Sequence, residues 1–293
     1  MSSRNSLKVN RATLSGIGAI ALWAFLALGA RAEAGVPPLL LTAIGFGVSG
    51  LAGMGWLLAR GQISVLHQPP RAWAHGVGGL FGYHALYFFA LSHAPAAQAN
   101  LLNYLWPLLI VLLSAWLLGL HLSLQHWLGI GLGLVGSFML LGQGVAFSAG
   151  FIPGYLAAVG AAFVWALYSV LARKWSVAVP TGALAGFCLA TAILAALAHI
   201  LFEPSFTPTA TNWLVACLMG LGPLGAAFYL WDYGMKQGDP RLIGTLAYIT
   251  PVASTLLLVL YGFAGFSWAL GLAAVLVGGG GLLASSFKTS PAK

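Results

Sequence analysis

One apolar segment of this chain places four polar or helix-bending residues on a single helical face. Asn100, Asn103, Tyr104 and Pro107 follow one another at i, i+3, i+4 and i+7, which is the spacing of one side of an α-helix. Amide and phenol groups form hydrogen bonds without carrying a charge at neutral pH. The pattern therefore predicts either the wall of a cavity that binds an uncharged group or hydrogen bonds between neighbouring helices.

Aromatic residues in other apolar segments extend this chemistry. Tyr83 and Tyr87 lie four residues apart, and His84 lies beside them as either a ligand contact or a structural group. Aromatic faces accept flat apolar groups and attract a cationic amine by about 0.5–2 kcal/mol. With no Lys or Arg in mid-segment, the set favours a neutral zwitterion over a phosphate or dianion. The remaining candidates for this binding site are Trp23, Trp165, Tyr168, Thr245 and Tyr248.

A single acidic residue, Asp232, lies inside an apolar segment. Proton-coupled carriers use such acids as relays, so Asp232 is a candidate coupling residue. Lys236 follows four residues later, however, and this spacing is also that of an ion pair near the end of a helix. Because no second acid accompanies it, we interpret the pair as structural and expect gradient-driven movement of the ligand.

The sequence lacks the motifs of catalytic and cofactor chemistry. It contains no GxSxG, HExxH or GxxxxGK[ST], and Cys188 and Cys217 have no metal-like spacing. We expect no enzyme activity, metal, cofactor or nucleotide-driven pumping, with an intramembrane enzyme as the alternative from another class. The net charge of +8 is too thinly spread for nucleic-acid binding.

The composition places the candidate residues in a membrane. Hydrophobic residues make up 60% of the 293 positions, with 12 Lys or Arg and 4 Asp or Glu, against roughly 25% charged residues in soluble domains. So few charges cannot cover a soluble exterior. The sequence predicts an all-α membrane protein whose ten runs are long enough to span a bilayer: 13–31, 38–59, 73–92, 95–118, 123–142, 153–172, 181–202, 211–234, 241–262 and 267–286.

The basic residues indicate the orientation of these spans. With a cytoplasmic N-terminus, 11 of the 12 lie on the inner side, and Arg31, next to Glu33, lies outside. Cytoplasmic loops are enriched in Lys and Arg, so we predict that both termini are cytoplasmic. The inner set is Arg4, Lys8, Arg11, Arg60, Arg71, Arg173, Lys174, Lys236, Arg241, Lys288 and Lys293.

The two halves of the chain resemble each other at an offset of 142–144 residues. We predict two five-helix repeats, 1–148 and 149–293, that form one transport domain. Because five is odd, the second repeat enters the membrane from the opposite side, and inverted repeats are typical of alternating-access transporters. The clearest recurrences are Trp23-Ala24 with Trp165-Ala166, Tyr104 with Tyr248, and Pro107 with Pro251.

Pro107 and Pro251 lie near the middle of the fourth span of each half. Proline removes a backbone hydrogen bond and bends a helix. The two matching bends are interpreted either as hinges for a change of conformation or as fixed bends that shape the cavity.

Together these features resemble the drug/metabolite transporter superfamily, in particular its EamA-type exporters. The resemblance covers the whole chain: ten spans in two halves, a tryptophan in the first span of each half and a proline in the fourth. Within the family, the chain looks most like the YddG-type exporters of aromatic and other neutral amino acids in the bacterial inner membrane.

The resemblance implies a monomeric basket of ten helices around a central cavity, embedded in lipid, with a small-molecule cargo. The implied activity is export of neutral amino acids by alternating access. A different drug or metabolite, exported by proton antiport, is the alternative within transport.

Overall fold

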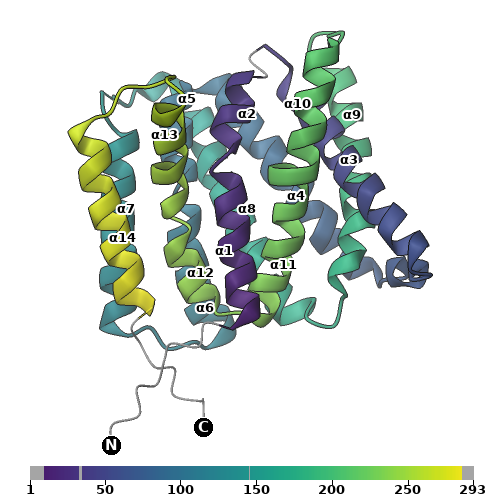
Figure 1. Cartoon of the computed structure of the whole chain (residues 1–293), viewed down its shortest axis with the longest axis horizontal. Helices are drawn as coiled ribbons and strands as arrows, with labels where there is room; N and C mark the ends of the chain where they lie inside the picture. The colour runs from purple at the N-terminus through teal and green to yellow at the C-terminus, as the bar shows by residue number, and fades with distance from the viewer. Residues whose placement is uncertain (1–9, 33–34, 145, 286–293) are drawn as a thin grey trace, which may run out of the picture.

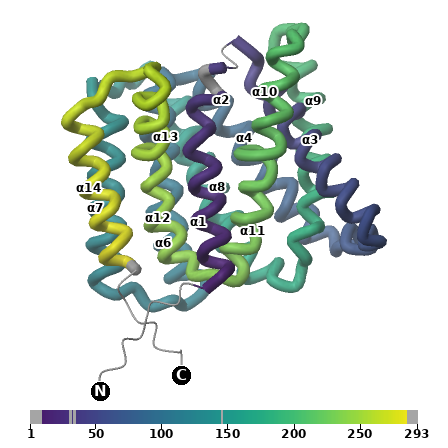
Figure 2. The backbone as a smooth tube through the Cα atoms, in the orientation of Figure 1, coloured from purple at the N-terminus to yellow at the C-terminus, as the bar shows by residue number. Residues whose placement is uncertain are grey.

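The computed structural model describes residues 10–32, 35–144 and 146–285, and every regular element in these ranges is helical. The prediction of an all-α chain is confirmed. The helices lie side by side in one bundle, and the backbone trace shows that most of them run along a common direction (Figures 1 and 2). Predictions for Arg4, Lys8, Glu33, Lys288 and Lys293, and the outer limits of the two repeats, lie outside the described residues.

Each of the ten predicted runs contains one helix or two consecutive helices. A π-helical turn, Gly222–Ala226, joins α10 to α11. The first half of the chain holds α1 (Arg11–Trp23), α2 (Leu26–Ala32), α3 (Pro38–Ala59), α4 (Pro70–His93), α5 (Ala96–Asn103), α6 (Trp106–Leu118) and α7 (Leu124–Leu141). The second half holds α8 (Ile152–Trp175), α9 (Leu184–Phe202), α10 (Ala210–Leu221), α11 (Ala227–Gln237), α12 (Pro240–Leu246), α13 (Ile249–Leu260) and α14 (Trp268–Ser285).

Within the described ranges, eight of these segments have the length and hydropathy of a membrane span, and α14 is a shorter apolar helix. The α4 segment is not among the eight, because three histidines lower its hydropathy. Length and hydropathy therefore support a multi-pass membrane protein but fall short of the predicted count of ten spans.

Two of the segments are interrupted just before a proline, as the sequence predicts. The α5 helix ends at Asn103 ahead of Pro107, and α12 ends at Leu246 ahead of Pro251. In both cases the ring would collide with the carbonyl four residues earlier and leave it without a donor, so the helix unwinds there. Two further interruptions are the break at Ala24, which divides α1 from α2 without a proline, and the π-helical turn between α10 and α11, which contains Pro223.

Close pairs of helices join the first half of the chain to the second. The α3 helix packs along α9, α4 along α8, α1 along α11, and α7 along α14. Glycine allows α7 and α14 to approach this closely. A Cβ atom at Gly129 would lie 2.6 Å from the carbonyl oxygen of Gly280, a contact that any larger residue would have to relieve. We call the end of the bundle where α1 begins and α14 ends the lower end, and the opposite end the upper end (Figure 1).

Glu203 connects α9 to α3 at the upper end. Its Oε1 accepts a hydrogen bond from the amide of Leu39 at 2.9 Å, and its Oε2 accepts one from the amide of Leu40 at 3.3 Å. His199 Nδ1 lies 2.9 Å from the same Oε2. A carboxylate at the N-terminus of a helix satisfies unpaired amides and interacts favourably with the helix dipole.

We expect Glu203→Ala to destabilise the protein by about 0.5–2 kcal/mol, the usual cost of losing a helix cap. Glu203→Gln, which retains one acceptor oxygen, should cost less. Thermal unfolding in detergent, followed by circular dichroism, measures the difference. Equal melting temperatures for Glu203→Ala and the wild type would show that the cap contributes nothing.

Candidate functional site

Four tryptophans from four helices meet inside the bundle. Trp23 of α1, Trp106 of α6, Trp165 of α8 and Trp231 of α11 are each at most 6% exposed. All six distances between their ring centroids lie between 4.9 and 6.5 Å. This tryptophan cluster joins both halves of the chain through apolar rings.

Hydrogen bonds fix two indoles of the tryptophan cluster. Trp23 Nε1 donates to the carbonyl of Pro223 at 3.1 Å, in the π-helical turn, and Trp231 Nε1 donates to Ser169 Oγ at 3.0 Å. Both donors are therefore satisfied although the rings are buried.

Two members of the tryptophan cluster, Trp106 and Trp231, are absent from the sequence-based candidates. The available signals were their neighbours: Trp106 follows Asn103 by three residues and so continues the polar face, and Trp231 immediately precedes Asp232. Neither signal shows which way the indole points.

Two tyrosines of α4 lie beside the tryptophan cluster. The ring centroid of Tyr83 is 5.3 Å from that of Trp165. Tyr83 and Tyr87 are parallel, with centroids 5.9 Å apart and an interplanar angle of 3°. Because α4 runs from the lower to the upper end, Tyr87 lies above Tyr83 (Figure 1). The pair therefore extends the aromatic wall from the tryptophans towards the upper end.

The polar face of α5 meets these tyrosines. The Tyr87 hydroxyl donates to Asn100 Oδ1, and Asn103 Nδ2 donates to the Tyr83 hydroxyl at 3.2 Å. The two asparagines thus form the bonds between helices that were one interpretation of their spacing. Among the described residues, however, the buried Oδ1 of Asn103 has no hydrogen-bond partner, and Tyr104 follows at the break before α6. Asn103 therefore retains a free acceptor beside the aromatic wall.

His84 is held in one orientation by its own helix. Its Nδ1 lies 2.7 Å from the carbonyl oxygen of Leu80, so Nδ1 carries the hydrogen. The ring packs against Phe46 and Phe228, with centroids 5.0 and 6.2 Å away. In the neutral ring this arrangement leaves Nε2 as an acceptor.

Tyr168 lies below Trp165 on α8. Its centroid is 5.3 Å from that of Trp165, and its ring stacks on His75 of α4 at 5.0 Å. Like the tryptophan cluster it is buried, with 5% of its surface exposed. Tyr168 therefore continues the aromatic packing towards the lower end.

The structure does not bring Thr245 and Tyr248 to the other candidates. Tyr248 is fully buried in a separate apolar cluster with Val111 and Ile130. Thr245 donates to the carbonyl of Arg241, in its own helix, at 2.9 Å. Both residues pack on α7, whose glycines leave room for them. Tyr248, which the repeat relates to Tyr104, thus has a packing role.

Asp232 and Lys236 form the ion pair predicted from their spacing. Lys236 Nζ lies 2.8 Å from Asp232 Oδ2, and each side chain is 6% exposed, so the pair is buried in the fold. Thr181 Oγ1 donates to the same carboxylate oxygen at 2.6 Å, and Lys236 Nζ also donates to the carbonyl of Val179 at 2.9 Å. A buried pair with these additional hydrogen bonds has the environment of a structural group.

A second ion pair lies at the lower end, between Asp239, which caps α12, and Arg241 in the first turn of that helix. Asp239 Oδ2 is 2.8 Å from Arg241 Nη2, and Arg241 Nη1 donates to the carbonyl of His121 at 2.7 Å. Burial raises the pKa of Asp239, but the hydrogen bonds and charge of Arg241 outweigh it and hold the pKa below its usual value. The stability from this link is therefore present at neutral pH and lost as the pH falls through the lowered pKa.

Two segments of the chain, residues 10–142 and 152–286, match the EamA-like transporter family. The chain belongs to this family. The resemblance seen in the sequence is thereby confirmed, and EamA-like proteins are transporters rather than enzymes.

Relatives of this EamA-family chain match it along nearly its whole length. The aromatic amino acid exporter YddG of Ancylobacter novellus is 53% identical over 278 residues, covering 94% of this chain and 96% of the relative. The exporter of the same name from Escherichia coli is 26% identical over 291 residues, covering 93% of this chain and 96% of the relative. A solved crystal structure that is 52% identical has a TM-score of 0.91 and covers 94% of this chain and 96% of its own.

Proposed function

We propose that this EamA-family chain exports aromatic and other neutral amino acids across a membrane. The observation that carries the proposal is an aromatic and polar site without a charged side chain, in a chain 53% identical to an aromatic amino acid exporter. A zwitterion with an apolar side chain needs hydrogen-bonding groups and a flat apolar wall but no full counter-charge.

The geometry of the site supports a specific mode of binding. The ammonium group of the substrate donates to Asn103 Oδ1, the buried acceptor that has no partner among the described residues. The apolar side chain lies against the rings of Tyr83 and Trp165, which are 5.3 Å apart. The neutral His84 ring supplies a second acceptor at Nε2. Aromatic faces also attract the ammonium group by cation–π interaction.

The proposed architecture is that of ten spans in two inverted repeats, 1–148 and 149–293, with cytoplasmic termini in the bacterial inner membrane. Two matches to the same family, at 10–142 and 152–286, support the duplication. The start of α1 and the end of α14 lie at the same end of the bundle, as an even number of crossings requires (Figure 1). The single chain holds both repeats and acts as a monomer.

In the proposed cycle the repeats expose the site to each side of the membrane in turn, and Pro107 and Pro251 mark the bends that change. Asp232 does not carry protons in this cycle, because Lys236 and Thr181 occupy its carboxylate. Movement of the amino acid follows its own gradient.

A counterflow assay in proteoliposomes tests the proposal. Vesicles loaded with unlabelled substrate should accumulate labelled Phe, Trp and Thr, and an unrelated organic cation should not enter. The rate should not depend on an imposed pH gradient. Absence of protein-dependent uptake for every amino acid would contradict the proposal, and uptake of the cation driven by a pH gradient would favour a drug antiporter.

Asn103→Leu is expected to raise the half-saturating concentration of Phe at least tenfold. The substitution preserves size but removes an acceptor for a charged ammonium group, a hydrogen bond worth about 1.5–3 kcal/mol. Gln62→Leu removes an exposed amide far from the site and serves as the control. An equal effect of the two substitutions on counterflow would exclude Asn103 from substrate binding.

A further inference from the structure

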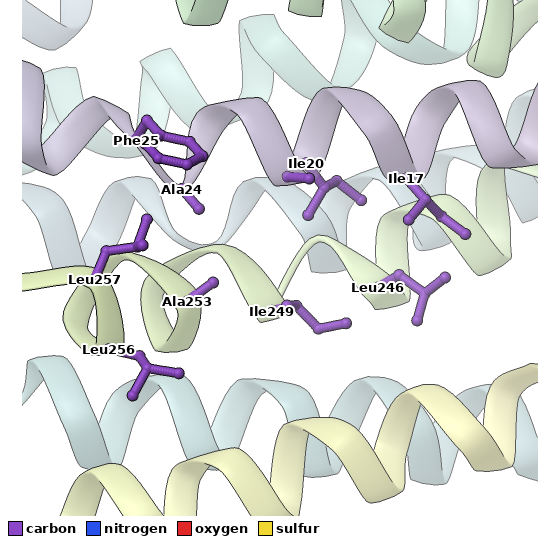
Figure 3. Close-up of a pocket in the computed structure, with 10 residues that line it drawn as sticks. Ile17, Ile20, Ala24, Phe25, Leu246, Ile249, Ala253, Leu256 and Leu257 are labelled. Carbon is purple, nitrogen blue, oxygen red and sulfur yellow. The ribbon is translucent and has the colours of Figure 1, made fainter. Parts of the chain in front are cut away.

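A groove of about 280 Å³ opens on the outside of the bundle between two interrupted helices. It lies between α1 and the two residues that follow it, Ala24 and Phe25, on one side and α12–α13 on the other (Figure 3). At its rim, Phe25 is 46% exposed and Leu256 is 43% exposed. The walls consist of carbon side chains, among them Ile17, Ile20, Ala24, Leu246, Ile249 and Ala253.

The backbone at the interruption does not turn this groove into a polar site. Ending α1 at Trp23 exposes carbonyl groups that a continuous helix would use. The carbonyl of Ala24 accepts a hydrogen bond from Ser254 Oγ at 2.9 Å, across the groove. The carbonyl oxygen of Ala24 thus has a hydrogen-bond partner within the protein, and the lining of the groove remains apolar.

The internal repeat provides a matched interface for comparison. An offset of 142 relates Ile20 of α1, and Ala24 just after α1, to Ala162 and Ala166 of α8. An offset of 144 relates Ile249 of α13 to Leu105, the residue just before α6, which packs against the same core. The α6 and α8 helices pack against each other more closely than the α1 and α13 helices do.

Small side chains contribute to the volume of the groove. Ala21 and Ala253 line the groove, and the residues related to them by the repeat are Phe163 and Leu109. At these two positions the groove therefore carries methyl groups where the other half of the chain carries larger side chains. Ala21 and Ala253 leave space at the surface between α1 and α13.

The groove faces the hydrocarbon of the bilayer, since it lies between two of the eight apolar segments long enough to span it. Water is a poor occupant, because an ordered water needs about 2–4 polar partners and the walls supply none. An empty groove would forfeit the dispersion contacts of its walls. A flexible alkyl chain fills a narrow apolar space and is abundant at that depth.

We propose that one acyl chain of a membrane phospholipid occupies this groove. This acyl chain contacts α1 and α13 together, so it differs from lipid that touches a single helix face. The acyl chain joins the segments on either side of Ala24 and of the break before Pro251. Any effect on their movement rests on the transport cycle proposed above.

The site is tested by photolabelling the full chain in vesicles of phosphatidylethanolamine and phosphatidylglycerol. A trace of phosphatidylcholine carries a diazirine in the middle of one acyl chain, and labelled peptides are mapped by mass spectrometry. We expect labelling of α1 and α13 to exceed that of α10 several-fold. The α10 face is a fair reference because Leu214 and Leu218 are 61% and 60% exposed.

The repeat itself supplies the variants. Ala21→Phe with Ala253→Leu fills the groove with the larger side chains found at the related positions 163 and 109 and should reduce its labelling to the level of α10. Ala253→Leu alone is the milder variant, expected to give a partial reduction, and Ala52→Phe on the exposed face of α3 is the control, expected to change nothing. Circular dichroism and gel filtration confirm that each variant is folded.

Labelling of α1 and α13 no stronger than that of α10 in the wild type would overturn the proposal. So would labelling that persists in a folded variant with the groove filled. No substrate takes part in the measurement, so its outcome is independent of the counterflow test of the proposed function.

Discussion

Replacing Lys236 with methionine is expected to destabilise the protein by about 3–5 kcal/mol, because the substitution leaves a buried carboxylate without its partner. The Nζ–Oδ2 distance to Asp232 is 2.8 Å, and both side chains are 6% exposed. Lys236 also bonds the carbonyl of Val179 at 2.9 Å. Methionine keeps much of the length of the side chain, so the loss of charge and of these bonds dominates.

Two variants make this result interpretable. Lys174→Met removes an exposed lysine from the lower end of α8 and should change the melting temperature in detergent little, since exposed charges contribute little to stability. Asp232→Asn with Lys236→Met removes both charges and should recover most of the lost stability, because replacing a whole buried pair is often nearly neutral. A melting temperature for Lys236→Met equal to that of Lys174→Met would contradict a stabilising pair.

The same pair bears on the energy source of transport. If Asp232 is structural, Asp232→Asn should lower stability but retain counterflow per folded molecule. Loss of counterflow in a variant with normal abundance and folding would reverse the assignment and make Asp232 a coupling residue.

Trp165→Ala is expected to reduce counterflow of aromatic substrates at least tenfold and to cost about 3–5 kcal/mol of stability, the range for truncating a buried tryptophan. Trp165 is 3% exposed and touches the other three members of the tryptophan cluster. It also contacts Tyr83 at 5.3 Å. Its loss therefore removes both the packing between the halves and the proposed wall for the substrate.

The control for this variant lies on the same helix. Trp175 is 53% exposed, so Trp175→Ala should leave both measurements close to those of the wild type. Trp165→Phe preserves an aromatic face and should lie between the two. Thermal unfolding measures the packing effect, and counterflow per folded protein measures the effect on transport. Equal results for Trp165→Ala and Trp175→Ala would contradict the roles given to the tryptophan cluster.

Local regularities explain which predictions from the sequence agree with the structure. The apolar runs become helices because a backbone in lipid must satisfy its own hydrogen bonds. The breaks before Pro107 and Pro251 follow from the geometry of proline, and the contact between Asp232 and Lys236 follows from helical spacing. Each inference depends on residues within a turn or two of one another.

Inferences about which side chains face the interior of the bundle were less successful, because that depends on residues far apart in the chain. Trp106 and Trp116 lie on one apolar helix, yet the first is 6% exposed and the second 77%. Exposing an indole ring to lipid costs little free energy, so the sequence does not show which of the two tryptophans is buried. The repeat relates Tyr248 to Tyr104, but Gly133 on α7 provides a surface on which Tyr248 packs.

Hydropathy and helical periodicity along the chain were enough to predict a multi-pass membrane protein and the polar face of α5, while the family was recognised from the resemblance of the whole chain to EamA-type exporters. These properties are carried by segments that form much the same helices whatever surrounds them. The tryptophan cluster, the burial of the Asp232–Lys236 pair and the groove between α1 and α13 depend on which helices meet. That depends on where glycines and alanines permit close approach, and such contacts join residues far apart in the chain that no local pattern connects.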